Sequence, residues 1–140
     1  TAVSPQTYEP PASTAGRLIL VIDDEEPVRE AVTDILALHD IEVITAVNGQ
    51  DGVSLFSRRK DEIQLILLDM SMPGMNGLDT LTQLRQISQD VHVLLSSGYS
   101  QQQIAHSVTV NGRTGFLAKP YNVDTLVNKV WQYLPNSANA

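Results

Sequence analysis

The sequence predicts an α/β domain in which five parallel strands form a sheet covered by helices on both faces, a doubly wound (βα)5 arrangement. Two observations lead to this prediction. Short apolar runs that read as buried strands alternate along the chain with segments whose apolar residues recur at helical spacing. The chain has 140 residues, the length of a single domain, and strands that alternate with helices form parallel sheets.

Five apolar runs are predicted to be the strands. They are RLILVI (17–22), EVITA (42–46), QLILLD (64–69), VHVLLS (91–96) and TGFLA (114–118). Each run is short and mostly apolar, as is typical of strands that are buried on both faces of a parallel sheet. Right-handed crossover connections between such strands leave few topologies to consider.

Helical spacing of apolar residues predicts one helix after each strand. The residues that carry the spacing are Val28, Ala31, Val32, Ile35 and Leu36 in the first helix, Val53 and Phe56 within 50–59, Leu78, Leu81 and Leu84 in the third, Ile104 and Val108 within 101–111, and Val123, Leu126, Val127, Val130 and Leu134 in the last. The fourth helix is predicted to be marginal because only two apolar residues keep the spacing. Asn122 is placed to cap the last helix.

Composition divides the chain and excludes several classes of function. Residues 1–15 contain three prolines among Ser, Thr and Ala, which predicts a flexible linker before a domain at 16–135 and a short tail at 136–140. The net charge of −7 argues against direct binding of nucleic acid. Without cysteine there is no disulfide framework and no thiolate chemistry. Without a long apolar run we expect a cytoplasmic domain.

The residues at the ends of the predicted strands form the candidate site. They are Asp23 and Asp24 after the first strand, Asp69 at the end of the third, Ser96 and Ser97 at the end of the fourth, and Lys119 after the fifth. In a parallel α/β sheet, ligands bind at the carboxyl ends of the strands, so these side chains are predicted to converge. One lysine cannot neutralise three acids, whereas Mg²⁺ or Mn²⁺ suits a set of oxygen ligands.

Each of these features alone has an ordinary structural explanation. Acids that precede a helix stabilise its N-terminus. The segment PGMNG (73–77) is typical of a turn, and a serine after a strand is commonly a loop residue. Their joint occurrence at four strand ends favours a functional site.

Four motifs carry a resemblance to a known family. They are VIDDEEPVR, LLDMSMPGMNG, LLSSGYS and GFLAKPY, and their order and spacing place a hydroxyl 28 residues after Asp69 and a lysine 22 residues further on. Over residues 16–135 the chain resembles the receiver domain of bacterial two-component response regulators. The resemblance implies a flavodoxin-like fold with strand order 2-1-3-4-5.

The resemblance also implies a role for each site residue. Asp69 matches the phosphoacceptor, and Lys119 matches the family's lysine. Asp23 and Asp24 match the acidic pair that holds Mg²⁺, with Asp24 expected as the direct ligand, and the backbone carbonyl of Ser71 matches a further metal ligand.

Two further positions match the family's switch residues. Ser97 matches the hydroxyl that binds the new phosphoryl group, and Ser96 takes its place if the register differs by one residue. Phe116 matches the aromatic switch, although it lacks the hydroxyl of the tyrosine often found there. The resemblance further implies a cis peptide bond between Lys119 and Pro120, since a sharp turn would aim the lysine at the site.

The expected function is that of a phosphorelay domain. Asp69 would take a phosphoryl group from a phosphohistidine on a histidine kinase or a histidine phosphotransfer protein, with Mg²⁺ present. Such a domain is not an enzyme in the usual sense, although it assists its own phosphorylation and dephosphorylation. The linker at 1–15 and the style of the later motifs favour the C-terminal receiver of a hybrid sensor histidine kinase over a stand-alone regulator.

Three other classes of protein fit the sequence less well. A phosphatase of the haloacid dehalogenase type places its nucleophile in a D-x-D motif after the first strand, where this chain has IDDEEP. A flavodoxin-type binding module needs a phosphate-binding loop at the same place. A serine hydrolase needs a G-x-S-x-G motif and a histidine at the site, whereas His39, His92 and His106 are all predicted to be structural or surface residues.

Overall fold

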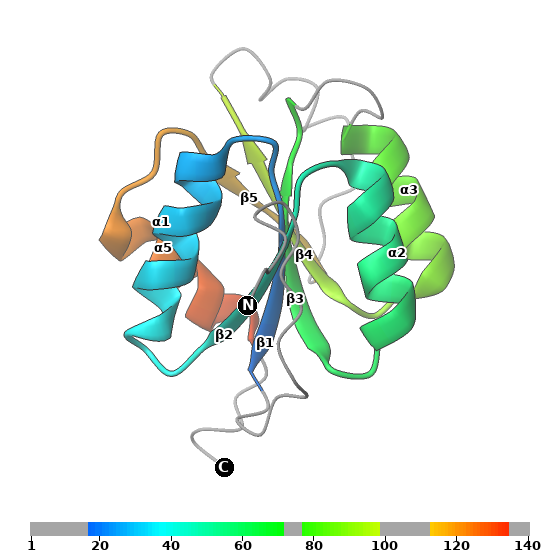
Figure 1. The fold of residues 1–140 in the computed structure, drawn as a ribbon, viewed down its shortest axis with the longest axis horizontal. Coiled ribbons are helices and arrows are strands. Elements are labelled where there is room, and N and C mark those ends of the chain that lie inside the picture. Colours follow the sequence, from blue (N-terminus) through cyan, green and yellow to red (C-terminus); the bar gives the residue numbers. More distant parts are fainter. Residues whose placement is uncertain (1–16, 72–76, 99–112, 135–140) are drawn as a thin grey trace, which may run out of the picture.

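The computed structural model describes residues 17–71, 77–98 and 113–134, and the elements below lie within these ranges. Five strands are present: β1 (Leu18–Ile22), β2 (Glu42–Ala46), β3 (Ile63–Asp69), β4 (His92–Ser97) and β5 (Thr114–Ala118). They form one sheet in the order β2-β1-β3-β4-β5, and every neighbouring pair is parallel. The predicted fold class and strand order are therefore confirmed (Figure 1).

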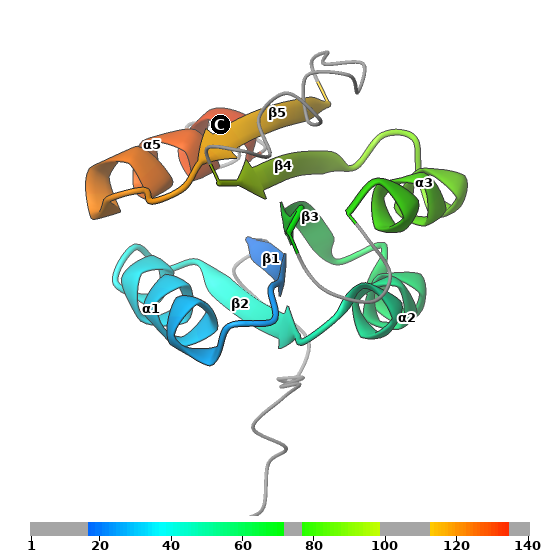
Figure 2. The same cartoon turned by 90° about the horizontal axis from the view of Figure 1, so that it is seen from above.

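Four helices of the described ranges cover the sheet. They are α1 (Glu26–Ala37), α2 (Gly49–Arg59), α3 (Gly77–Ile87) and α5 (Val123–Tyr133). Helices α1 and α5 lie on one face of the sheet and α2 and α3 on the other, as the view from above shows (Figure 2). The predicted fourth helix at 101–111, the linker at 1–15 and the tail at 136–140 lie outside the described residues. No helix of the described ranges is long and apolar enough to span a membrane.

The sheet separates two apolar cores. Alternate residues of each strand point to opposite faces, so Leu20, Ile66 and Leu95 pack with α2 and α3, whereas Val21, Leu67 and Leu94 pack with α1 and α5. We call these the α2/α3 face and the α1/α5 face. Both cores are buried because most residues of the central strands are apolar.

The caps and ends of the helices agree with the sequence in most places. Asn122 caps α5 as predicted, since its Oδ1 accepts a hydrogen bond from the Thr125 amide at 2.8 Å. Asn48 caps α2 in the same way at 2.7 Å from the Asp51 amide. The prediction that Val123 belongs to the buried stripe of the last helix is wrong, because this first residue of α5 is 51% exposed. It lines a surface groove together with residues of α1.

The aromatic residues of α5 pack at its C-terminal end. Trp131 is partly buried against the α1/α5 core, with the Arg17 guanidinium 5.2 Å from its ring centroid. The Tyr133 ring meets His92 edge to face, with centroids 5.9 Å apart. His39 is exposed beyond α1, and His106 lies outside the described residues. The two described histidines are thus a surface and a packing residue, as predicted.

Candidate functional site

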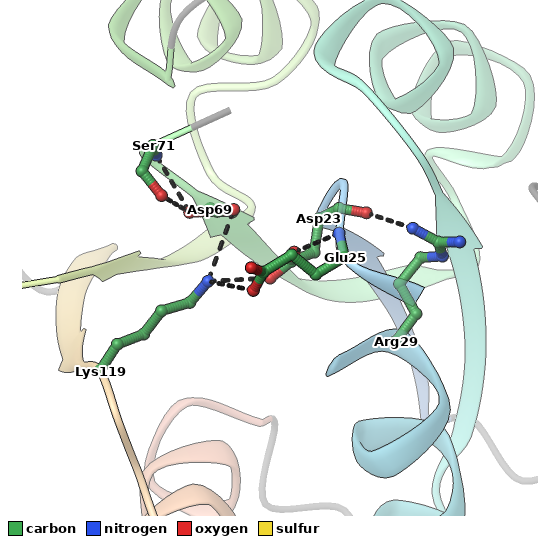
Figure 3. Close-up of polar contacts among 6 residues, drawn as sticks. All are labelled: Asp23, Glu25, Arg29, Asp69, Ser71 and Lys119. Atoms are coloured by element: carbon green, nitrogen blue, oxygen red, sulfur yellow. Dashed lines mark hydrogen bonds and ion pairs between the residues drawn. The ribbon is translucent and has the colours of Figure 1, made fainter. Parts of the chain in front are cut away.

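The acidic residues at the ends of β1 and β3 meet the lysine that follows β5. Lys119 Nζ lies 3.2 Å from Asp23 Oδ2, 3.4 Å from Asp69 Oδ2 and 3.8 Å from Glu25 Oε1 (Figure 3). Both aspartates are buried, with 3% of Asp23 and 1% of Asp69 exposed to solvent. Three strands that are apart in sequence therefore bring one ammonium group into contact with two buried carboxylates.

Asp24 completes a group of three carboxylates. One oxygen from each of Asp23, Asp24 and Asp69 lies within 4.8 Å of the others. Burial raises the pKa of Asp23 to about 6, and the charge of Asp69 adds to this, although the Glu25 amide and Lys119 oppose it. Burial and the charge of Asp69 also raise the pKa of Asp24. Lys119 therefore does not offset the burial and mutual repulsion of these carboxylates, and oxygen atoms so placed fit a divalent cation.

Lys119 stays charged in this position. Burial lowers its pKa, but the charges of Asp23 and Asp69 outweigh this effect, so the pKa is raised overall. The peptide bond from Lys119 to Pro120 is cis, as predicted. The chain therefore offers a fixed positive charge beside the carboxylate of Asp69 at neutral pH.

The carboxylate of Asp69 is oriented by the residue two positions further on. Its Oδ1 accepts hydrogen bonds from the Ser71 amide at 3.0 Å and from the Ser71 hydroxyl at 2.8 Å. The sequence pointed to the backbone carbonyl of Ser71 and missed its side chain. An aspartate followed after one residue by serine is a common local turn, so this contact had a sequence signal. The two bonds hold the plane of the carboxylate fixed.

The end of the PGMNG motif is explained by close packing. A Cβ atom at Gly77 would lie 2.7 Å from Met70 Cα, so only glycine lets the start of α3 approach the residue that follows Asp69. The preceding loop at 72–76 lies outside the described residues. Gly77 therefore fixes where α3 begins relative to the end of β3.

The structure distinguishes the two candidate serines by the face of the sheet they occupy. Strand β4 extends to Ser97, one residue beyond the prediction. Alternation along β4 places Ser97 on the α2/α3 face with Leu95, and Phe116 packs against the core of that same face. Ser96 lies on the α1/α5 face, where its hydroxyl is buried without a hydrogen-bond partner among the described residues. Ser97 and Phe116 thus lie on the same face of the sheet, whereas Ser96 lies on the other.

Main-chain hydrogen bonds hold the strand ends in place. The Met70 amide donates to Ser96 O at 2.8 Å, and the Lys119 amide donates to Ser97 O at 2.7 Å. Asp69 is also the register partner of Ser96. The phosphoacceptor candidate, both serines and the lysine are therefore fixed relative to one another by the sheet itself.

Three residues near the site were missed by the sequence analysis. Arg29 of α1 is buried, and its Nη1 donates to the Asp23 carbonyl at 2.8 Å (Figure 3). Glu25 contributes the third carboxylate around Lys119. Tyr121 has a buried hydroxyl beside the site. Arg29 and Glu25 stand within the VIDDEEPVR motif, but their contacts depend on how α1 packs, which the motif does not specify.

An apolar groove adjoins the site. It lies between α1 and the segment from Lys119 to Val123, has a volume of about 810 Å³, and is lined by Val28, Ala31, Ile35 and Tyr121 among others. Lys119 and Glu25 also line it, so the groove leads to the carboxylates.

Comparisons with known proteins agree with this geometry. A family model described as "Response regulator receiver domain" matches residues 19–131. Sporulation initiation phosphotransferase F of Bacillus subtilis is 26% identical over 121 residues, which cover 86% of this chain and 96% of that protein. The transcriptional regulatory protein CpxR of Escherichia coli is 32% identical over 119 residues, which cover 85% of this chain but only 50% of CpxR.

A solved structure shows the same fold. The crystal structure of the receiver domain from the hybrid histidine kinase CckA superposes with a TM-score of 0.71 and 25% identity, covering 84% of this chain and 99% of that one.

Proposed function

Because the chain belongs to the response regulator receiver domain family of two-component signalling, we propose that Asp69 accepts a phosphoryl group from a phosphohistidine. One observation carries this proposal: a buried carboxylate at the end of a central strand lies 3.4 Å from a lysine ammonium group and beside two further acids. The haloacid dehalogenase alternative places its nucleophile after the first strand, and nothing in this geometry favours it.

The chemistry is an in-line displacement at phosphorus. A carboxylate oxygen of Asp69 attacks the phosphorus atom, a P–O bond forms as the P–N bond of the phosphohistidine breaks, and the electron pair of that bond returns to the imidazole nitrogen. The product is an acyl phosphate. Lys119 neutralises charge on a phosphoryl oxygen, and Ser71 keeps the attacking carboxylate in one orientation. The domain thereby assists its own phosphorylation without being an enzyme that acts on a separate substrate.

Asp23, Asp24 and Asp69 would hold a divalent cation, Mg²⁺ or alternatively Mn²⁺, together with the backbone carbonyl of Ser71. When bound, the cation neutralises the charge of the carboxylates and of the transferring group. The fit rests on the mutual distances of the carboxylate oxygens and on the raised pKa values of Asp23 and Asp24.

Phosphorylation of Asp69 is proposed to alter the packing on the α2/α3 face of the sheet. Ser97 ends β4 on the α2/α3 face, and Phe116 packs on that face from the neighbouring strand. A phosphoryl group on Asp69 would attract the Ser97 hydroxyl, and Phe116 would repack in response. Since Phe116 carries no hydroxyl, this signal is transmitted through packing alone.

The proposed donor is the phosphohistidine-bearing domain of a histidine kinase or a histidine phosphotransfer protein. The apolar groove that leads to Lys119 supports a protein donor, because an apolar helix surface could dock in it within reach of Asp69. The likeness to the CckA receiver supports a place within a hybrid histidine kinase. ATP, the source of the phosphoryl group for such kinases, is a cytoplasmic metabolite, so we place the domain in the cytoplasm, with no direct contact to nucleic acid.

The test is phosphorylation by a small phosphodonor in the presence of Mg²⁺. Mass spectrometry should detect one added phosphoryl group that is stable in acid and labile in base, as an acyl phosphate is. Asp69→Asn should abolish it, whereas Asp34→Asn, which alters an exposed residue of α1, should not. Equal phosphorylation of Asp69→Asn would assign the phosphoacceptor to another residue.

A further inference from the structure

Tyr121 stands two residues after Lys119 in the GFLAKPY motif, between β5 and α5. Its ring packs against the core of the α1/α5 face. It also lines the groove beside the site, together with Lys119 and Glu25. The side chain therefore lies on the part of the α1/α5 face that adjoins Lys119 and Glu25.

The hydroxyl of Tyr121 is buried and has no hydrogen-bond partner among the described residues. A buried hydroxyl without a partner destabilises a folded protein, because it gives up its bond to water and gains nothing in return. Phenylalanine would fill the same space and bury the same ring without this cost. Among the described residues, the hydroxyl thus makes no hydrogen bond that would stabilise the unphosphorylated domain.

The surroundings of this hydroxyl are anionic. Burial and the charges of Asp23, Asp69 and Glu25 raise the pKa of Tyr121, so the O–H remains protonated. A protonated phenol is a hydrogen-bond donor, and the groups that influence it belong to the site where a phosphoryl group would arrive. Lys119, two residues earlier, already contacts all three carboxylates.

We propose that Tyr121 is a phosphoryl-binding residue, whose hydroxyl has no acceptor among the described residues and donates a hydrogen bond to a phosphoryl oxygen once the group is on Asp69. This inference rests on the proposed function. Phosphorylation adds three strong acceptor oxygens to a site whose neighbour Tyr121 has an O–H with no partner among the described residues. A hydrogen bond to an ionic acceptor is stronger than one between neutral groups, so the phosphorylated state is selectively stabilised.

The experiment compares three forms of the full chain: wild type, Tyr121→Phe and Tyr133→Phe. Tyr133 is the matched control, because its ring packs on His92 at the amino end of β4, whereas the carboxylates lie at the carboxyl ends of the strands. Two quantities are measured for each form. One is the affinity for beryllofluoride, a mimic of the phosphoryl group, in the presence of Mg²⁺. The other is the urea midpoint with EDTA and no ligand.

Tyr121→Phe should bind beryllofluoride about tenfold more weakly than wild type, the loss expected for one hydrogen bond to a charged acceptor. Its urea midpoint without ligand should be equal to that of wild type or higher. Tyr133→Phe should keep the wild-type affinity. This combination would not arise from a purely structural role, which would lower the midpoint.

Two results overturn the inference while leaving the proposed function intact. One is an unchanged beryllofluoride affinity in Tyr121→Phe beside clear binding by wild type. The other is a lower urea midpoint for Tyr121→Phe without ligand, since it would mean that the hydroxyl already has a partner. If wild type and Tyr133→Phe both fail to bind beryllofluoride with Mg²⁺, the proposed function itself is wrong, and the role of Tyr121 is wrong with it.

Discussion

Replacing Asp23 by asparagine should stabilise the metal-free protein at neutral pH. Asparagine is close in shape to a protonated aspartic acid and keeps the side-chain oxygen that accepts the Glu25 amide at 2.9 Å. It removes the negative charge that burial and Asp69 disfavour. The change therefore tests whether the site is strained electrostatically when no cation is bound.

The size of the effect follows from the pKa of Asp23. Folding raises it from 3.8 to about 6, a difference of about 2 units, and each unit corresponds to about 1.4 kcal/mol. The folded state holds the proton more tightly than the unfolded state, so stability falls as the pH rises between these two values. Above pH 6 the ionised Asp23 lowers the free energy of unfolding by about 3 kcal/mol. Asp23→Asn should recover about 1–3 kcal/mol of this free energy of unfolding. The gain falls short of the full amount because the substitution also removes the ion pair with Lys119.

Urea denaturation with EDTA, followed at several values between pH 3.5 and 8, measures this difference. The stability gain of Asp23→Asn should be near zero below pH 3.8, grow up to pH 6 and then level off. Asp61→Asn is the control, because Asp61 is exposed in the turn after α2. A variant that is less stable than wild type at pH 7.5, or a gain that is the same at all pH values, would refute the reasoning.

Two other substitutions test the metal site and the packing behind it. Asp24→Ala should weaken Mg²⁺ binding by at least about tenfold, because it removes a carboxylate ligand. Amide shifts in a Mg²⁺ titration measure the affinity, and Glu30→Ala, which alters an exposed residue of α1, is the control. An unchanged affinity in Asp24→Ala would exclude Asp24 as a ligand. Gly77→Ala should lower the free energy of unfolding by about 1–3 kcal/mol, because the new Cβ would meet Met70 Cα. Gly98→Ala, where a Cβ meets nothing within 4 Å, should not do so, and equal urea midpoints for the two variants would contradict the packing argument.

The strands and their ends could be predicted because the signal is local. An uninterrupted apolar run such as the one before Asp69 has few structures open to it, and the polar residue that ends it must lie at the edge of the sheet. The end of β4 was placed one residue early because Ser96 and Ser97 are alike in sequence. Only the alternation of the whole strand, with Leu95 on one face and Leu94 on the other, assigns each serine to its face.

Contacts between elements could not be predicted from the sequence. Arg29 reads as a polar residue of an amphipathic helix, yet it is buried against the Asp23 carbonyl because of how α1 crosses the end of β1. Val123 fits the apolar spacing of α5, but as the first residue of the helix it is exposed. That the Tyr121 hydroxyl has no partner among the described residues could not be predicted either, since it depends on what the fold places around it.

The hydrogen bonds that join the strand ends have an evolutionary consequence. The amides of Asp23, Met70 and Lys119 donate to main-chain carbonyls of the neighbouring strands, and every residue has a carbonyl to accept such a bond. Mutation of the accepting residues therefore leaves the alignment of the strand ends intact, provided that the core stays apolar. The helices and outer surfaces can then change without moving the strand ends. The surface of the domain can thus change while the carboxylates and the lysine keep the same arrangement.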